Sequence, residues 1–344
     1  MIQPNIYFYI PHALFPKTIP QNINENWAGF GLGIYAWILQ TYLRLKADGF
    51  PCQLVDYFPQ SGIVLTHRNC LSVHKPSKPG RNLLLICIKA ESNFYPYAQL
   101  HVVQNPEEVE RINPGHYIPH WPQPGLIPRD YKRGERFENV VFFGHLNNLA
   151  PELLSDEWKN TLSQLGLNWC PIINKNHWTD YQTIDPRWND YSQADAVVAI
   201  RSFGKENKYI NKPATKLFNA WLAGVPAVLG YESAYRAEGI PNFHYLEVTS
   251  LNELLFALKQ LKSNQTIRKY LIRNAQSKLN QIHRDKITQN WRYFLEETAT
   301  AAFYEWCSKP RQVQNMILES RYLSWMINRG QSKIASFALN TLKR

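Results

Sequence analysis

The sequence predicts an α/β protein with two doubly wound parallel sheets that face each other across a cleft, followed by a basic helical segment. Two observations support this prediction. Short apolar runs alternate with helical patterns along most of the chain, and a stretch rich in proline and glycine interrupts the alternation near the middle. With 344 residues, of which 44% are hydrophobic, the chain can bury a core in each of two domains.

The first half opens with the pattern of a strand–helix–strand unit. The apolar run at 5–10 predicts a buried strand, and the glycine-rich sequence WAGFGLG at 27–33 opens a helix that ends at Gly49. The glycines indicate a tight turn, because they lack the full spacing and the acidic residue of a dinucleotide-binding fingerprint. Further apolar runs predict strands at 51–58, 62–67, 82–90 and 100–105. Such runs are typical of a parallel sheet that is covered on both faces.

Proline and glycine then mark a linker. Residues 113–136 contain five prolines and three glycines and show no sustained periodicity. We expect an N-terminal domain, a linker, a C-terminal domain, and helices that cross back to the first domain and end in a basic tail. The expected bounds of these four parts are 1–125, 126–137, 138–288 and 289–344.

The second half repeats the alternation of strands and helices. Apolar runs predict strands at 139–144, 168–173, 196–200 and 226–230. Periodic segments predict helices at 155–166, 213–223 and 233–239, and from about residue 251 the chain is expected to be helical throughout. Strands that alternate with helices imply a second parallel sheet, whose ligands bind beyond the carboxyl ends of its strands.

The excess positive charge lies in the C-terminal part of the chain. Residues 257–344 hold 16 Lys and Arg against 5 Asp and Glu, whereas residues 1–256 hold 22 of each. This asymmetry favours an anionic partner for the tail, and an anionic membrane fits the mixture of basic and apolar residues there. Two alternatives stay open, namely packing of the tail on the first domain and a solvated helical surface.

The cysteines and the N-terminus indicate the cellular compartment. Five scattered cysteines without CxxC spacing argue against a disulfide framework and against a structural zinc site. The first residues do not show the charged and apolar pattern expected of a secretory leader, and no apolar run is long enough to predict a membrane span. We therefore expect a cytoplasmic protein, with the tail as a candidate contact for the inner membrane surface.

A pair of lysines suggests an anion site. Lys212 and Lys216 lie four residues apart at the start of a predicted helix, where the helix dipole disfavours cations unless an anion compensates. Other strand ends of the same predicted sheet carry candidate partners: Gly144, His145, Arg201, Ser202, Glu232 and Ser233. The convergence favours a bound phosphate group over two ammonium groups that extend into water.

The segment KPATKLFNAWLAGVPAVLG at 212–230 resembles the donor domain of the retaining nucleotide-sugar glycosyltransferases with the GT-B fold. The matching positions are Ala220, Ala223, Gly224, Pro226 and Val228. Asn211 and Asn219 stand where that group carries glutamates. The resemblance implies two Rossmann-like domains, of which the first binds the acceptor and the second binds the nucleotide-sugar donor.

The resemblance also implies a function and donor-binding residues. We expect transfer of a sugar from a nucleotide-sugar to an unidentified acceptor hydroxyl, with the nucleotide-sugar as co-substrate and no other cofactor. Lys216, Lys212 and Arg201 would neutralise the donor diphosphate in place of a metal, since the sequence has no DxD motif. The N–H groups of Gly144 and Ser233 would bind the same group. Asn219 would hold the ribose, and His145, Ser202 and Glu232 complete the predicted donor site.

An inverting transfer would also need a general base on the acceptor hydroxyl. His12, directly after the first strand, is the first candidate, with Asp56 or Glu91 to orient it. His120 in the linker and His145 are rival candidates. Because both glutamates of the retaining group are replaced, the stereochemical course stays open.

Other functions are compatible with the same pattern. A nucleotide-sugar epimerase on this fold would need no acceptor, and a non-catalytic protein that binds sugars or polyanions would explain the two asparagines. The acceptor of a transferase would be a carbohydrate or a lipid-linked molecule, and nucleic acid is not expected as a partner. Donor turnover separates the enzymes from the binder, and acceptor dependence separates transferase from epimerase.

Overall fold

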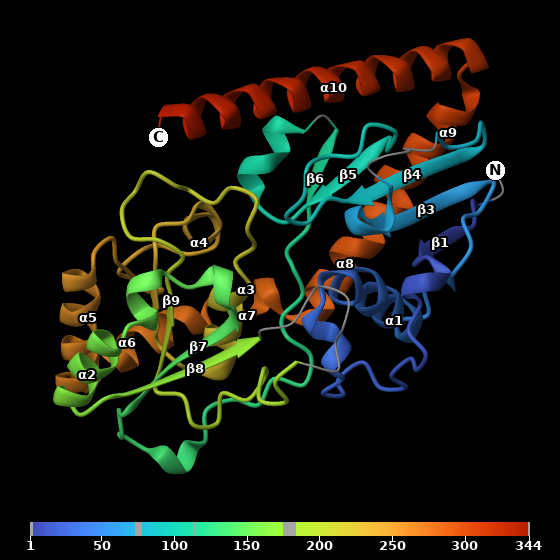
Figure 1. Ribbon diagram of the computed structural model, residues 1–344. Coiled ribbons are helices and arrows are strands. Elements are labelled where there is room, and N and C mark those ends of the chain that lie inside the picture. Colours follow the sequence, from blue (N-terminus) through green and yellow to red (C-terminus); the bar gives the residue numbers. More distant parts are fainter. Residues whose placement is uncertain (1–2, 73–77, 113, 175–183, 343–344) are drawn as a thin grey trace.

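The computed structural model describes residues 3–72, 78–112, 114–174 and 184–342, with side chains of the last helix described as far as Ile327. The chain forms two α/β domains, each built on a parallel sheet, and a helical C-terminal segment (Figure 1). This arrangement confirms the predicted fold class. The four domain bounds given above remain predictions, although the first sheet ends at Tyr117 and the second begins at Asn139.

The N-terminal sheet is parallel throughout, in the order β2-β1-β3-β4-β5-β6. Its strands are β1 (Ile6–Tyr9), β2 (Gln53–Val55), β3 (Gly62–His67), β4 (Leu83–Ile88), β5 (Leu100–Val103) and β6 (Gly115–Tyr117). Every residue of β3 and β4 is buried, as expected for central strands that are covered on both faces. All strand carboxyl ends therefore lie along one edge of this sheet.

The helix predicted after WAGFGLG begins differently from the expectation. A 3-10 turn over Ala28–Gly31 and a π-helical turn over Tyr35–Leu39 precede α1 (Gln40–Ala47). Tyr35 donates its hydroxyl to the carbonyl of Leu14 at 2.8 Å, which joins this turn to the loop after β1. A π-helical turn inside a helix often marks a functional surface, because it displaces side chains from regular helical positions.

The C-terminal sheet is also parallel, in the order β11-β10-β9-β7-β8. Its strands are β7 (Asn139–His145), β8 (Asn168–Asn174), β9 (Ala196–Ala199), β10 (Ala227–Leu229) and β11 (Leu246–Glu247). The helices of this half are α2 (Asp156–Gln164), α3 (Thr215–Ala223), α4 (Ser233–Glu238), α5 (Leu251–Ser263), α6 (Gln265–Gln276) and α7 (Leu279–Ile282). The Ser155 side chain caps α2, and Gly224 ends α3 in the left-handed conformation that glycine favours.

The C-terminal helices complete the N-terminal domain. They are α8 (Arg284–Tyr293), a π-helical turn (Phe294–Ala299), α9 (Thr300–Ser308) and α10 (Arg311–Leu342). Helix α8 contacts α1, and α9 contacts β3 and β4. Trp291, Leu295 and Trp306 lie in the same buried core as the N-terminal sheet. The chain therefore crosses between the domains twice, once through the linker and once through α8.

The described part of the basic tail packs on the N-terminal domain. Figure 1 shows α10 lying along that domain. Arg321 donates to the carbonyls of Ala98 and Gln99, and the Tyr322 ring stacks on Tyr97 with 5.4 Å between centroids. The basic residues Arg329, Lys333, Lys343 and Arg344 lie outside the described side chains.

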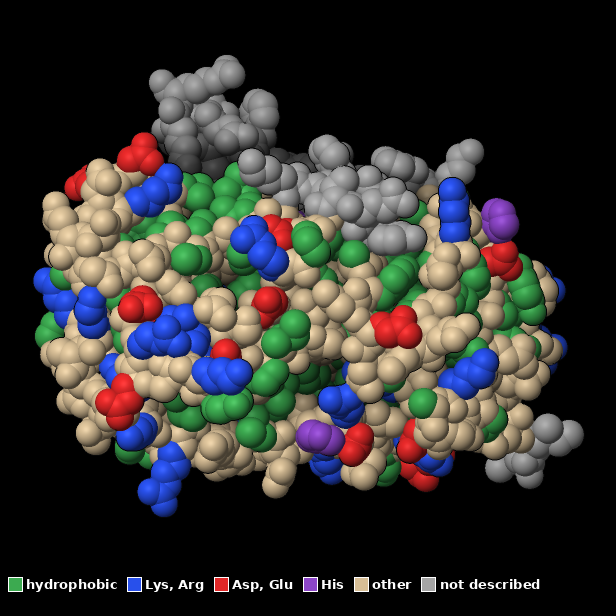
Figure 2. All heavy atoms as spheres, turned by 90° about the horizontal axis from the view of Figure 1, so that it is seen from below, with side chains coloured by type: hydrophobic (Ala, Val, Ile, Leu, Met, Phe, Trp, Pro, Cys, Tyr) green, Lys and Arg blue, Asp and Glu red, His purple; other side chains and the backbone are tan. Residues whose placement is uncertain are grey.

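Charges of both signs are mixed elsewhere on the surface. Figure 2 shows Lys and Arg side chains interspersed with Asp and Glu over one face of the molecule. Within the described residues, no helix is both long enough and apolar enough to cross a membrane.

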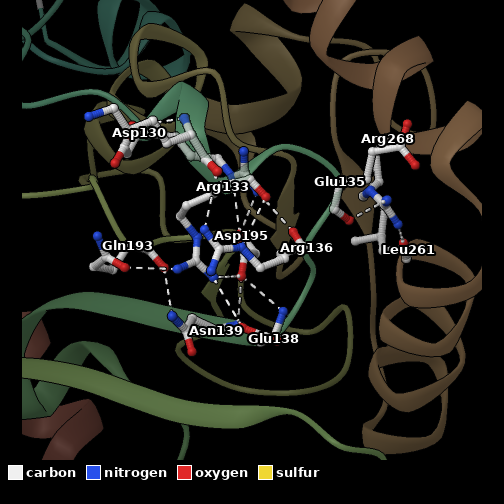
Figure 3. Close-up of polar contacts among 12 residues, drawn as sticks. Asp130, Arg133, Glu135, Arg136, Glu138, Asn139, Gln193, Asp195, Leu261 and Arg268 are labelled. Atoms are coloured by element: carbon white, nitrogen blue, oxygen red, sulfur yellow. Dashed lines mark hydrogen bonds and ion pairs between the residues drawn. The ribbon is translucent and has the colours of Figure 1, made fainter.

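One buried carboxylate fixes the linker to the C-terminal domain (Figure 3). The Asp195 side chain is fully buried and accepts four hydrogen bonds from Arg129 and Arg133, at 2.6 to 3.1 Å. It also accepts the backbone N–H groups of Glu138 and Asn139, both at 2.9 Å. The Asp195 carboxylate thus binds both the end of the linker and the start of β7.

We predict that Asp195→Ala destabilises the protein by about 3 to 5 kcal/mol, because it removes the buried counter-ion of the Arg133 guanidinium. Burial alone would raise the pKa of Asp195, but the hydrogen bonds from Arg133 and the backbone hold it below its usual value. The stabilisation is therefore present at neutral pH and is lost as the pH falls below about 4. Differential scanning calorimetry at pH 7 is the measurement.

Glu305→Ala is the matched control, since Glu305 forms an exposed ion pair with Lys309 and should contribute at most about 0.5 kcal/mol. A decrease in Tm that is the same for both variants would contradict the anchoring role of Asp195.

Candidate functional site

A cleft of about 390 Å³ lies between the two domains. It lies at the carboxyl ends of both sheets: His67 ends β3, Glu91 follows β4, Gly144 lies near the end of β7 and Arg201 follows β9. The linker lines the cleft as well, from His120 to Pro124. This is where parallel α/β sheets place their ligand sites.

Gly144 and Lys216 touch on the C-terminal side of the cleft. A Cβ atom at position 144 would lie 3.3 Å from Lys216 Cε and 3.4 Å from Nζ, and Gly144 has φ +151°, which favours glycine. The ammonium group also lies 5.6 Å above the centre of the Phe142 ring. Glycine at 144 thus lets the lysine lie against the end of the strand.

Lys216 is a half-buried cation that has no counter-ion among the described residues. Burial lowers its pKa to about 7, and repulsion by Arg201 adds to the effect. Among the described residues that line the cleft, the basic side chains of Lys or Arg type are Lys216 and Arg201. Within the described part of the chain, Lys216 forms no ion pair. The lysine charge is therefore available to an anion that enters the cleft.

Arg201, in contrast, already has a partner. It forms a buried ion pair with Glu232, and its Nε donates to the side-chain oxygen of Asn148 at 3.0 Å. Burial raises the pKa of Glu232, and the Arg201 charge opposes that shift. Glu232 does not line the cleft, so the structure places this predicted donor residue behind Arg201 as its counter-ion.

The start of α3 supplies a further polar group that the sequence analysis missed. Thr215, the first residue of α3, lines the cleft. Its hydroxyl is buried and has no hydrogen-bond partner among the described residues. The first N–H groups of a helix also lack intrahelical acceptors. A threonine at the first turn of a predicted helix, directly before Lys216, is the sequence signal that could have identified it.

Lys212 points to the other domain instead of the cleft. Its ammonium forms an ion pair with Glu91 of the N-terminal domain. Asn211 next to it donates its amide to the Glu91 carbonyl at 3.0 Å, and its own carbonyl accepts from Gln104 at 2.8 Å. Lys212 and Asn211 therefore hold the domains together and do not line the cleft.

Ser233 and Ser202 also lie outside the cleft lining. The Ser233 N–H, expected to bind a phosphate, donates to the Lys208 carbonyl at 2.9 Å, and its hydroxyl accepts from Asn105 at 2.8 Å. The Ser202 hydroxyl lies 2.6 Å from that of Tyr209, which donates to it. Both predicted donor residues are thus engaged in contacts within the protein.

Asn219 and His145 do line the cleft. The Asn219 amide donates to the Gln123 side chain at 2.8 Å and accepts the Gln123 N–H at 3.1 Å, so it fixes the linker against α3. Burial and the nearby Lys216 charge lower the pKa of His145, which keeps its ring neutral near pH 7.

The predicted catalytic pair is formed but lies at the surface. His12 Nδ1 lies 2.7 Å from Asp56 Oδ2, as the sequence suggested. The His12 side chain is 90% exposed, however, and neither residue lines the cleft. Glu91, the alternative partner, lines the cleft and is paired with Lys212.

Two other histidines line the N-terminal side of the cleft. His67 ends β3, a position that the sequence analysis did not consider, although the end of a buried parallel strand is a common place for site residues. His120 lies in the linker, and its ring contacts Trp37 edge-to-face at 4.6 Å between centroids. In the described residues, no three His, Cys, Asp or Glu side chains lie close enough to hold a metal ion.

Known proteins share the fold but little sequence. Neither a protein-family profile nor a curated protein matches the sequence. Anabaena Alr3699/HepE in complex with UDP and glucose is similar over 86% of this chain and 100% of its own, with 12% identity and a TM-score of 0.51. The avilamycin glycosyltransferase AviGT4 has 12% identity and a TM-score of 0.49 over 89% of this chain and 98% of its own. The chain thus has the two-domain GT-B fold of glycosyltransferases.

We predict that Lys216→Met raises the Tm of the protein. A lysine whose folded pKa of about 7 lies below its unfolded value destabilises the fold fully below pH 7, and this penalty shrinks as the pH rises toward about 10.4. Calorimetry should show a gain of about 1 to 2 kcal/mol at pH 6.5 and a smaller gain at pH 9.

Lys212→Met is the control, because it removes a paired lysine and should leave Tm unchanged or lower. Equal gains at both pH values for Lys216→Met would show that the ammonium is not desolvated.

Proposed function

We propose that this protein is a glycosyltransferase that moves a sugar from a nucleotide-sugar to an acceptor hydroxyl. One observation carries the proposal: Lys216, half-buried and without an ion-pair partner among the described residues, lies in the interdomain cleft against the glycine-bearing end of β7. A diphosphate would supply the missing negative charge. The fold supports the proposal as well, since a protein with the same arrangement is described in complex with UDP and glucose.

The groups around Lys216 suit a diphosphate leaving group. The Thr215 hydroxyl is buried and donates to no acceptor among the described residues. The N–H groups in the first turn of α3, which have no intrahelical acceptor, are close to it in the chain. Anions bind at such helix N-termini because the N–H groups and the helix dipole both favour negative charge. Asn219, held by Gln123, offers an amide for the donor ribose.

The chemistry assigned to this side of the cleft is charge stabilisation. When the bond between the sugar and the diphosphate breaks, negative charge grows on the leaving oxygen. A positive group that is already desolvated stabilises that charge without reorganisation of solvent. In the proposed reaction Lys216 performs this role with Thr215, and the diphosphate needs no divalent metal, so EDTA should not inhibit transfer.

The first test is a thermal-shift panel of UDP, GDP, ADP and CMP with their common sugar conjugates. A ligand at 100 times its Kd adds about 2.7 kcal/mol, which corresponds to a rise in Tm of several degrees. The shift should be lost in Lys216→Met and kept in Lys212→Met, whose side chain does not line the cleft. Stabilisation by no nucleotide at all, or an equal shift in Lys216→Met, would refute the proposal.

We also predict that nucleotide-sugar affinity decreases as the pH rises from 6.5 to 9. The free protein loses the Lys216 proton near pH 7, whereas a bound diphosphate retains it, so binding takes up a proton in this range. The diphosphate of a nucleotide-sugar keeps its charge over these pH values, which leaves Lys216 as the titrating group. Calorimetric titration in two buffers of different ionisation enthalpy measures the proton uptake, which Lys216→Met should abolish.

A further inference from the structure

His67 and His120 present opposite hydrogen-bonding groups to the cleft. Both line its N-terminal side, and the charge of His120 is close enough to affect the titration of His67. The other charged groups that act on the two rings are Arg68, next to His67, and Glu91, after β4. The state of each ring follows from its own hydrogen bond.

His67 is a hydrogen-bond donor that has no acceptor among the residues whose structure is described. Its Nδ1 accepts the backbone N–H of Asn69 at 3.1 Å, so Nδ1 carries a lone pair. Burial lowers the pKa of His67 to about 3, and a neutral ring must then hold its proton on Nε2. The residue is 3% exposed, and Nε2 has no hydrogen-bond partner in the described part of the chain. Leaving a buried donor unpaired is costly, so a buried ring N–H without a partner is a candidate to bind a ligand.

His120 has the opposite tautomer. Its Nδ1 lies 2.7 Å from the Trp121 carbonyl, which can only accept, so Nδ1 carries the proton. Burial lowers the pKa of His120 and keeps the ring neutral, which leaves a lone pair on Nε2. Within the described residues this nitrogen has no hydrogen-bond partner. The edge contact with Trp37 and the Trp121 carbonyl fix the ring orientation.

We propose that His67 and His120 bind one acceptor hydroxyl between them, with His120 as the general base of an inverting transfer. This inference rests on the proposed function. The hydroxyl accepts a hydrogen bond from His67 Nε2–H and donates its own proton to His120 Nε2. His67 thus orients the oxygen so that its lone pair faces the sugar, and His120 makes it nucleophilic.

The proposed transfer forms one bond, breaks one bond and moves one proton. The acceptor oxygen forms a bond to the anomeric carbon, and the bond between that carbon and the diphosphate oxygen breaks. The hydroxyl proton moves to His120 Nε2, and the electron pair of the broken bond stays on the diphosphate, next to Lys216. The imidazolium then returns its proton to solvent after product release.

The carboxylates of the cleft favour a single displacement. A double displacement with retention needs a free carboxylate as nucleophile. Glu91 is the one carboxylate among the described residues that line the cleft, and it is paired with Lys212. Asn211, where the resemblance would place a glutamate, is hydrogen-bonded to Glu91 and Gln104 and does not itself line the cleft. His12 lies outside the cleft as well, so it is badly placed to act as the base.

The tautomers can be tested without any substrate. Long-range ¹H–¹⁵N correlation spectra of protein with ¹⁵N-labelled histidine, at pH 7.5, report which ring nitrogen carries the proton. We expect a neutral ring with the proton on Nε2 for His67 and a neutral ring with the proton on Nδ1 for His120, assigned by loss of each signal in His67→Gln and His120→Gln. The reverse tautomer at either residue, or a charged ring, would overturn the proposal.

The reaction is tested with the nucleotide-sugar that gives Lys216-dependent stabilisation, with water as the acceptor. ¹H NMR of the first-released sugar should show the inverted anomer. His120→Gln should lower kcat 100- to 10,000-fold, abolish the decrease of kcat/KM at acid pH and leave the donor Kd within twofold. His283→Gln, at the start of α8, is the control histidine and should leave the rate unchanged.

The outcomes separate this proposal from the one on which it rests. Loss of donor binding in wild-type protein refutes the glycosyltransferase function. Normal, Lys216-dependent donor binding with a retained anomer, or with full activity in His120→Gln, refutes only the role of the histidines. A loss of activity in His12→Gln that His120→Gln does not share would move the base to the surface pair.

Discussion

The path of the linker is the constraint on which the cleft depends. The linker lines the cleft, and it is held at both ends by buried polar contacts. Trp121 is fully buried, donates its indole N–H to Thr41 of α1 at 2.8 Å, and lies under the Arg44 guanidinium at 5.0 Å. At the other end Asp195 binds the two linker arginines. Gln123 lies between these anchors and His120 directly precedes Trp121, so the positions of both relative to α3 follow from the anchors.

Three cations lie at the strand ends of the C-terminal domain, and they differ in whether a carboxylate pairs with them. Arg201 is paired with Glu232 and Lys212 with Glu91, so each of these two cations already has a counter-ion. Of the Lys and Arg residues described in the cleft lining, Lys216 is the one whose charge is not neutralised by a described carboxylate. Burial of such a group costs stability, and proteins usually keep a cost of this kind where function needs it. The asymmetry between two lysines four residues apart is therefore the clearest sign of a site.

The sequence could predict the fold but only part of the candidate site. Parallel sheets follow from the continuous apolar runs, and the carboxyl ends of β7 and β9 bring Gly144, Lys216 and Arg201 together as expected. Helical spacing could not tell Lys216 from Lys212, because the partner of Lys212 lies 121 residues away in the other domain. The contact of His12 with Asp56 was predictable from adjacent strand ends. Its exposure was not, since it depends on how the loop after β1 turns over the surface.

The division of labour between the domains follows from the same electrostatics. The C-terminal side of the cleft presents a desolvated cation, which suits a departing anion, whereas the N-terminal side presents two neutral imidazoles. Burial lowers the pKa of His120 and outweighs the opposing effect of the Glu91 charge, so the ring stays unprotonated at neutral pH. It gains a proton most readily when negative charge develops nearby, as it does when the diphosphate departs. In the proposed reaction the bond that breaks on one side of the cleft thus raises the basicity of the group that acts on the other.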